Sequence, residues 1–143
     1  MEKKTKIILG LLTIIVLIAI FGSIWWVIPV YLFNGVSPED ISKIRVSNGT
    51  TNRQFDITDP EDITFIVENI QKIPMKRNPI SGGIGTTYAL NFFNTEGEVF
   101  YHLTINKSYI LEESEIYYQS EEELRTVNQY LLSLEKAEFP EDE

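Results

Sequence analysis

The longest apolar stretch of the chain lies near its N-terminus, where residues 7–33 contain no charged side chain. As an α-helix, this stretch would extend roughly 40 Å at about 1.5 Å per residue, whereas the hydrocarbon core of a bilayer is about 30 Å thick. Trp25, Trp26 and Tyr31 gather at its C-terminal end, and such residues are enriched where a bilayer meets water. The pattern therefore predicts a transmembrane helix over residues 7–33, preceded by a short basic stub at residues 1–6.

The charges on either side of this stretch predict its orientation. Lys3, Lys4 and Lys6 precede it, whereas residues 34–40 carry no Lys or Arg. Because cations accumulate on the cytoplasmic side of a transmembrane helix, we expect the N-terminus in the cytoplasm and the C-terminal domain on the extracytoplasmic side. The alternative is a cleaved signal peptide, whose apolar region normally spans about 7–15 residues and ends at small residues. The longer run and its bulky tryptophans favour an uncleaved anchor.

Beyond the anchor, alternating apolar and polar residues predict β-strands. Ile44 and Val46 alternate with polar residues, and a second alternation begins at residue 54. The Asn48-Gly49 pair between them is typical of a type I′ turn, so this segment predicts a hairpin. Four further strands are predicted over residues 87–93, 99–106, 108–112 and 115–119.

Two amphipathic helices are predicted from their start signals and apolar stripes. Asp59 is suited to cap the first helix, Pro60 suits its first position, and Pro74 ends it. Ser120 and Glu123 form the pattern of a capping box at the start of the second helix, which should end near Lys136. The apolar stripes are Ile63, Ile66, Val67, Ile70 and Ile73 in the first helix, and Leu124, Val127, Leu131 and Leu134 in the second.

The predicted order of elements is ββαββββα, which describes an α+β domain with an antiparallel sheet and two helices on one face. This domain is expected over residues 41–137, after a linker at residues 34–40 and before an acidic tail at residues 138–143. Residues 75–85, which contain three glycines, are predicted as a long loop between the first helix and the next strand.

Charge and composition exclude several classes of function. The chain has 143 residues and a net charge of −9, and from Asn34 onward 9 Lys and Arg stand against 20 Asp and Glu, a net charge of −11. Such a surface repels phosphate backbones, so we expect no nucleic-acid partner. The absence of cysteine excludes disulfides and thiol nucleophiles. His102 is the single histidine, and with no nucleophile or carboxylate assigned beside it we interpret it as structural.

The candidate ligand site is a group of cations beside the glycine-rich loop. Lys72, Lys76 and Arg77 lie within six residues of one another, and Gly82 and Gly83 follow closely. Cations on an acidic body attract anions locally, and glycines let backbone N–H groups approach a ligand. The alternative is a solvated loop in which Lys72 only stabilises a helix C-terminus. A P-loop is excluded because no Lys-Ser/Thr pair and no helix follow the glycines.

Two acidic clusters raise the alternative of calcium binding. They are Glu112-Glu113-Ser114-Glu115 and residues 121–123. Neither has the spaced Asp, Asn and Gly ligands of an EF-hand loop. We therefore interpret the first cluster as a solvated corner and the second as helix capping, and we expect neither a metal site nor a cofactor.

The basic start MEKKTK, the anchor, and the passages at residues 44–49 and 56–63 carry a resemblance over most of the chain. With these features it resembles the small exported proteins of Gram-positive bacteria that have one N-terminal anchor and a cysteine-free domain of unknown function. The resemblance implies a location and a fold type, and no active residues.

These features favour a non-enzymatic, membrane-anchored extracytoplasmic module that binds an envelope protein or an anionic ligand, in an accessory, sensing or immunity-like role. The alternative is a hydrolase that acts on wall or lipid material through two carboxyl groups, which would have to lie about 5–10 Å apart. A third interpretation is a structural subunit of a larger envelope complex.

Overall fold

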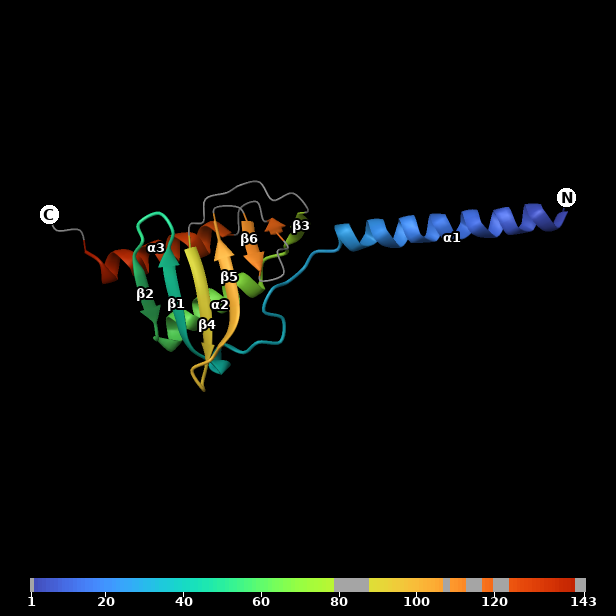
Figure 1. The fold of residues 1–143 in the computed structure, drawn as a ribbon. Coiled ribbons are helices and arrows are strands. Elements are labelled where there is room, and N and C mark those ends of the chain that lie inside the picture. The colour runs from blue at the N-terminus through green and yellow to red at the C-terminus, as the bar shows by residue number, and fades with distance from the viewer. Residues whose placement is uncertain (1, 79–87, 107–108, 113–116, 120–123, 141–143) are drawn as a thin grey trace.

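The computed structural model describes residues 2–78, 88–106, 109–112, 117–119 and 124–140. A long N-terminal helix projects from a domain in which strands and two further helices are packed together (Figure 1). The helices are α1 (Glu2–Val27), α2 (Pro60–Gln71) and α3 (Leu124–Glu138), with a short 3-10 turn, η1, at Pro38–Asp40. The strands are β1 (Ile41–Asn48), β2 (Gln54–Ile57), β3 (Lys76–Asn78), β4 (Tyr88–Asn94), β5 (Val99–Ile105), β6 (Tyr109–Glu112) and β7 (Tyr117–Gln119).

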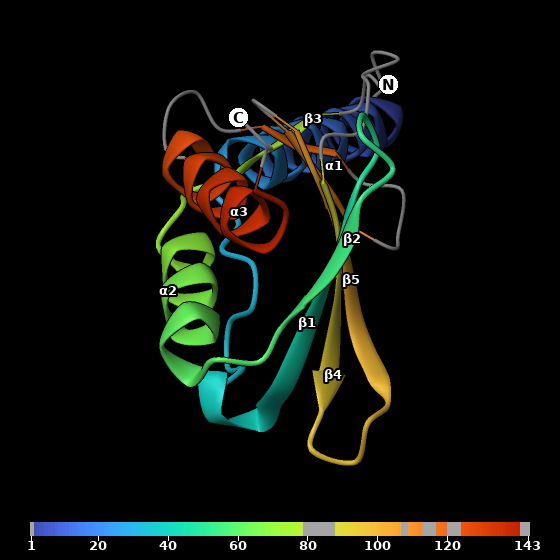
Figure 2. The same ribbon diagram turned by 90° about the vertical axis from the view of Figure 1, so that its left-hand side faces the viewer.

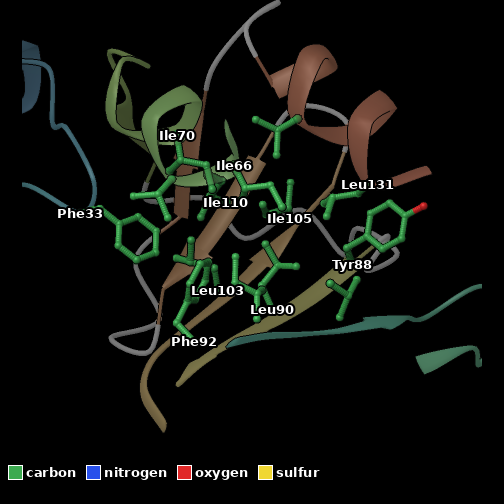
Figure 3. Close-up of a cluster of buried hydrophobic side chains, with 14 of the residues drawn as sticks. Phe33, Ile66, Ile70, Tyr88, Leu90, Phe92, Leu103, Ile105, Ile110 and Leu131 are labelled. Carbon is green, nitrogen blue, oxygen red and sulfur yellow. The ribbon is translucent and has the colours of Figure 1, made fainter. Parts of the chain in front are cut away.

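The strands form one antiparallel sheet in the order β2-β1-β4-β5-β6-β7-β3, and α2 and α3 lie side by side on one of its faces (Figure 2). The predicted α+β class, with two helices on one face of an antiparallel sheet, is therefore confirmed. Alternate residues of the strands point toward the helices, as the sequence pattern predicts. Leu90, Phe92 and Leu103 from the sheet meet Ile66 and Ile70 from α2 in the core (Figure 3).

The start of α2 is the one predicted from its capping residues. The side chain of Asp59 accepts a hydrogen bond from the backbone N–H of Glu61 at 2.8 Å, and Pro60 occupies the first helical position. The apolar stripe of α2 is fully buried, with Ile66, Val67 and Ile70 at 0% exposure. Ser120 and Glu123, the predicted capping box of the last helix, lie outside the described residues.

The turn between β1 and β2 differs from the predicted type I′ turn at Asn48-Gly49. Residues 49–53 separate the strands, and the backbone N–H of Asn48 bonds the carbonyl of Arg53 at 2.9 Å. The Asn48 side chain accepts hydrogen bonds from the N–H groups of Thr50 and Thr51, at 2.8 and 3.2 Å. The positive φ of 55° falls at Asn52, a residue type that tolerates it. Asn48 thus organises a longer turn through its side chain, which the Asn-Gly pair alone does not reveal.

The first part of the predicted loop at residues 75–85 is a strand. β3 pairs antiparallel with β7 and forms an edge of the sheet, so Lys76 and Arg77 lie on a strand and not in a loop. The expected count of six strands was therefore one too few for the described chain. A three-residue strand of polar side chains shows no alternation, and only its long-range pairing identifies it.

The N-terminal helix ends at Val27, earlier than the predicted end at Phe33. Beyond Pro29 the chain turns into the domain, where Val30 and Met75 exchange backbone hydrogen bonds of 2.8 and 2.9 Å. Leu32 and Phe33 are each only 3% exposed, and the Phe33 ring lies 4.7 Å from that of Phe92. These apolar residues belong to the core, although in sequence they continue the apolar run of the anchor.

A fragment that begins at Ile28 should therefore melt cooperatively without the anchor. A fragment that begins at Ile41 should be less stable by about 3 kcal/mol or more, because it lacks the two buried side chains of Leu32 and Phe33. Thermal unfolding followed by circular dichroism measures this difference. As a control, Ile70→Asp in the longer fragment should abolish its melt, because it places a charge at a fully buried position. Equal melting of the two fragments would contradict the assignment of residues 30–33 to the domain.

Candidate functional site

One helix among the described residues, at Lys3–Val27, is long and apolar enough to cross a membrane. Its apolar side chains from Ile7 to Val27 are exposed along its whole length. At about 1.5 Å per residue this apolar part extends about 30 Å, which matches the hydrocarbon core of a bilayer. Among the described residues, this helix is thus left uncovered by the domain except at its last turn, and its length and composition suit a membrane span.

Arg77 of β3 connects the domain to the last turn of this helix. Its Nη1 donates a hydrogen bond to the backbone carbonyl of Trp25 at 2.9 Å, and its guanidinium lies 4.5 Å from the centre of the Trp25 ring. The last carbonyls of a helix lack partners within the helix, and a cation there also interacts favourably with the helix dipole. Arg77 therefore acts as a cap for the C-terminal end of α1.

The structure brings only part of the predicted cationic site to this junction. Lys76 is exposed on β3 next to Arg77. Lys72 follows the end of α2, and its amine forms an exposed ion pair with Glu68 at 3.1 Å, a contact that contributes little stability. Gly82 and Gly83 lie outside the described residues. The described cations of the candidate site are thus Lys76 and Arg77 on β3, with Lys72 held in a local pair.

A second polar feature lies on the face of the sheet opposite the helices, and sequence reasoning missed it. Asp56, Arg45, Asn91 and His102 stand directly opposite one another on four adjacent strands, β2, β1, β4 and β5. The Arg45 guanidinium donates two hydrogen bonds to the Asp56 carboxylate, at 2.8 and 3.0 Å. His102 Nδ1 lies 2.7 Å from Asn91 Oδ1, within hydrogen-bond distance.

This polar row is internally paired. The hydrogen bond from Arg45 lowers the pKa of Asp56 and raises the pKa of Arg45, and Lys43 also lies 3.4 Å from the carboxylate. Lys43 and Arg45 further lie 4.4 and 5.5 Å from the ring centre of Phe93. The period-2 pattern places each residue on this face, but only the strand register brings the four together.

The one carboxylate buried in the core of the described chain belongs to Glu135 of α3, which is 2% exposed. It accepts hydrogen bonds from the Asn48 amide at 2.8 Å and from the hydroxyls of Tyr88 and Thr51 at 2.9 Å each. Burial raises the pKa of Glu135, but these three hydrogen bonds and the positive charge of Arg53 together outweigh it, so the pKa lies below its ordinary value. Burial and the bond to Glu135 in turn raise the pKa of Tyr88. The cluster ties α3 to the β1–β2 turn, at the end of the domain away from α1 (Figure 1).

No group of three or more His, Asp or Glu in the described part of the chain is placed to hold a metal ion. Comparison with protein-family models, with curated proteins and with solved structures found no match to this chain. The geometry therefore defines a class and no family: an α+β domain joined to an exposed apolar helix, with a cationic edge strand at the junction.

Replacing Glu135 tests the buried cluster. Glu135→Gln should lower the free energy of unfolding by about 1–3 kcal/mol, because an amide N–H₂ then faces one of the three donors. Because the folded pKa lies below the ordinary value of 4.5, the contribution of Glu135 is present above that pH and is lost as the pH falls through the folded pKa. The parent should therefore lose more stability on acidification than the variant.

Glu138→Gln is the matched control, since Glu138 is exposed on the same helix. Denaturant unfolding at neutral and acidic pH measures all three proteins. Equal pH dependence in the parent and Glu135→Gln would show that this carboxylate contributes nothing to acid sensitivity.

Proposed function

We propose that this protein is a single-pass membrane protein whose C-terminal domain lies on the extracytoplasmic side and binds a partner at the cell envelope. The observation that carries this proposal is the exposed apolar helix that continues directly into the core of the domain at Leu32 and Phe33. Lys3, Lys4 and Lys6 before the helix, with no Lys or Arg at residues 34–40, support a cytoplasmic N-terminus.

Four carboxylates of the described chain have structural partners, and this favours binding over hydrolysis. Asp56 is paired with Arg45, Glu135 is held by three neutral donors, and Asp59 caps α2. Asp62 accepts a hydrogen bond from Tyr130, which raises the pKa of Tyr130 to about 12. A carboxylate-based hydrolase needs one acid that donates a proton and a second that attacks or activates water. Each of these four carboxylates instead has a structural partner, so we propose a non-enzymatic module with an accessory, sensing or immunity-like role.

The proposed orientation predicts the outcome of protease digestion. Protease added to intact cells stripped of their wall should remove the domain and leave α1 in the membrane, because the cation bias retains the N-terminus inside. Immunoblotting for tags at either end reads the result, and a cytoplasmic protein that stays intact is the control. Full protection of a C-terminal tag would show that the domain faces the cytoplasm.

A binding role further predicts a component that elutes with the chain in a fixed ratio when it is purified in mild detergent. Ile70→Asp is the matched variant, because it unfolds the domain and leaves α1 unchanged. A partner held by the folded domain should be lost from this variant, whereas one held by α1 should remain. Elution of the parent alone, with no protein, polymer or lipid attached, would contradict the binding role.

A further inference from the structure

Arg77 of β3 contacts α1 near its C-terminal end, and the position of this contact along the helix sets the depth at which β3 meets a bilayer. If the apolar part of α1 from Ile7 to Val27 spans the hydrocarbon core, Val27 lies at its outer boundary. Trp25 lies two residues before that boundary, about 3 Å along the helix axis. The Arg77 guanidinium, whose Nη1 lies 2.9 Å from the Trp25 carbonyl oxygen, therefore lies at this boundary, where the glycerol backbones of the lipids begin. The contact between β3 and α1 places this part of the domain in the headgroup layer.

The aromatic residues around this contact are consistent with that depth. Trp25 is 63% exposed, and Trp26 and Tyr31 are each 50% exposed. Tryptophan and tyrosine in the headgroup layer bury an apolar ring and keep a polar group near water. The exposure of these three rings is thus explained by lipid around the point where Arg77 contacts α1.

The charge at this contact is opposite to that of the domain as a whole. From Asn34 onward the chain carries a net charge of −11, yet the strand that touches α1 contributes Lys76 and Arg77. An acidic domain on an anionic membrane is repelled by the surface, and cations at the point of contact locally reverse the repulsion.

The two side chains suit a phosphate group. Arg77 is held in orientation by the Trp25 carbonyl and ring, and a planar guanidinium matches two oxygens of a phosphate. Lys76 is exposed and leaves β3 on the opposite side, because successive residues of a strand alternate. Its long flexible stem allows the amine to reach a headgroup from that side.

We propose that Arg77 binds the phosphate of an anionic phospholipid in the leaflet on which the domain sits, and that Lys76, from the other side of β3, contacts a neighbouring anionic headgroup. This inference rests on the proposed membrane anchoring and names the ligand of the predicted cationic site. A lipid is favoured over a soluble wall polymer or an acidic protein segment, because either of those would have to enter the headgroup layer to reach the guanidinium beside Trp25.

The chain supplies its own probe for this proposal. Its only two tryptophans, Trp25 and Trp26, lie beside the proposed site, so intrinsic tryptophan fluorescence reports on that position alone. The full chain is reconstituted into vesicles of phosphatidylcholine and phosphatidylglycerol in equal amounts, with either one or the other lipid brominated on its acyl chains. Bromine quenches tryptophan at short range, so the ratio of the two quenching values measures which lipid is enriched there. Both leaflets have the same composition, so the direction of insertion does not affect the result.

The parent should prefer phosphatidylglycerol about fivefold for each cation held at the surface, and the preference should fall with added salt. Lys76→Glu should reduce the preference at least fivefold, and Arg77→Gln should reduce it with Lys76 intact.

Lys136→Glu is the matched control, because Lys136 is exposed near the C-terminal end of α3 and away from α1 (Figure 1). This control makes the same charge change and should retain the parent preference. Each protein is compared with itself in two lipid mixtures, so changes in tryptophan brightness cancel.

Equal quenching by the two brominated lipids in the parent would overturn the proposal, as would an equal loss of preference in Lys76→Glu and Lys136→Glu. Removal of the preference by free glycerol phosphate in solution would assign the site to a soluble anion and also overturn it. Any of these results leaves the protease and co-purification tests of the proposed function untouched. If protease removes the domain from cells but the two brominated lipids quench the parent equally, the domain is anchored at the membrane and does not select lipid.

Discussion

The pairing of Val30 with Met75 is the constraint on which the arrangement of this protein depends. Its two backbone hydrogen bonds hold the segment that leaves α1 against the segment that follows α2. Leu32 and Phe33 can then enter the core within a few residues of the helix end. A flexible linker would let the domain move freely on its anchor, whereas this pairing, together with the contact of Arg77 with Trp25, holds the end of α1 against the domain.

The same constraint determines where the charges of β3 lie. Because Met75 is paired with Val30, the next two residues pass the end of α1, and Arg77 reaches the Trp25 carbonyl. The contact satisfies a helix carbonyl and brings a cation to the depth of lipid headgroups. Anchoring and ligand selection are thus proposed for the same few residues.

The two ends of the domain are organised by different interactions. At the end beside α1, aromatic rings, a guanidinium and backbone pairing join helix to sheet. At the other end, the buried carboxylate of Glu135 joins α3 to the β1–β2 turn through Asn48, Thr51 and Tyr88. A buried charge is tolerated there because three donors, from β1, β4 and the turn after β1, converge on it. The sheet face between the ends carries cross-strand pairs that neutralise one another, such as Arg45 and Asp56.

The sequence by itself determined the features that depend on near neighbours in the chain. The apolar length of α1, the cap at Asp59, the buried stripe of α2 and the alternation in β1, β4 and β5 are all local patterns. Together they were sufficient for the α+β class and for the placement of both helices on one face.

Only the tertiary structure decided which local patterns meet. One continuous apolar run contains both a helix that ends at Val27 and the core residues Leu32 and Phe33. The sequence does not distinguish the two parts, because burial depends on what packs around a side chain and not on its hydrophobicity. The first residues of a predicted loop form β3, which the sequence does not reveal because an edge strand is defined by the strand with which it pairs. The sequence shows Arg77 only as one of several neighbouring cations, whereas in the structure it contacts Trp25, 52 residues earlier in the chain. No local pattern encodes that contact.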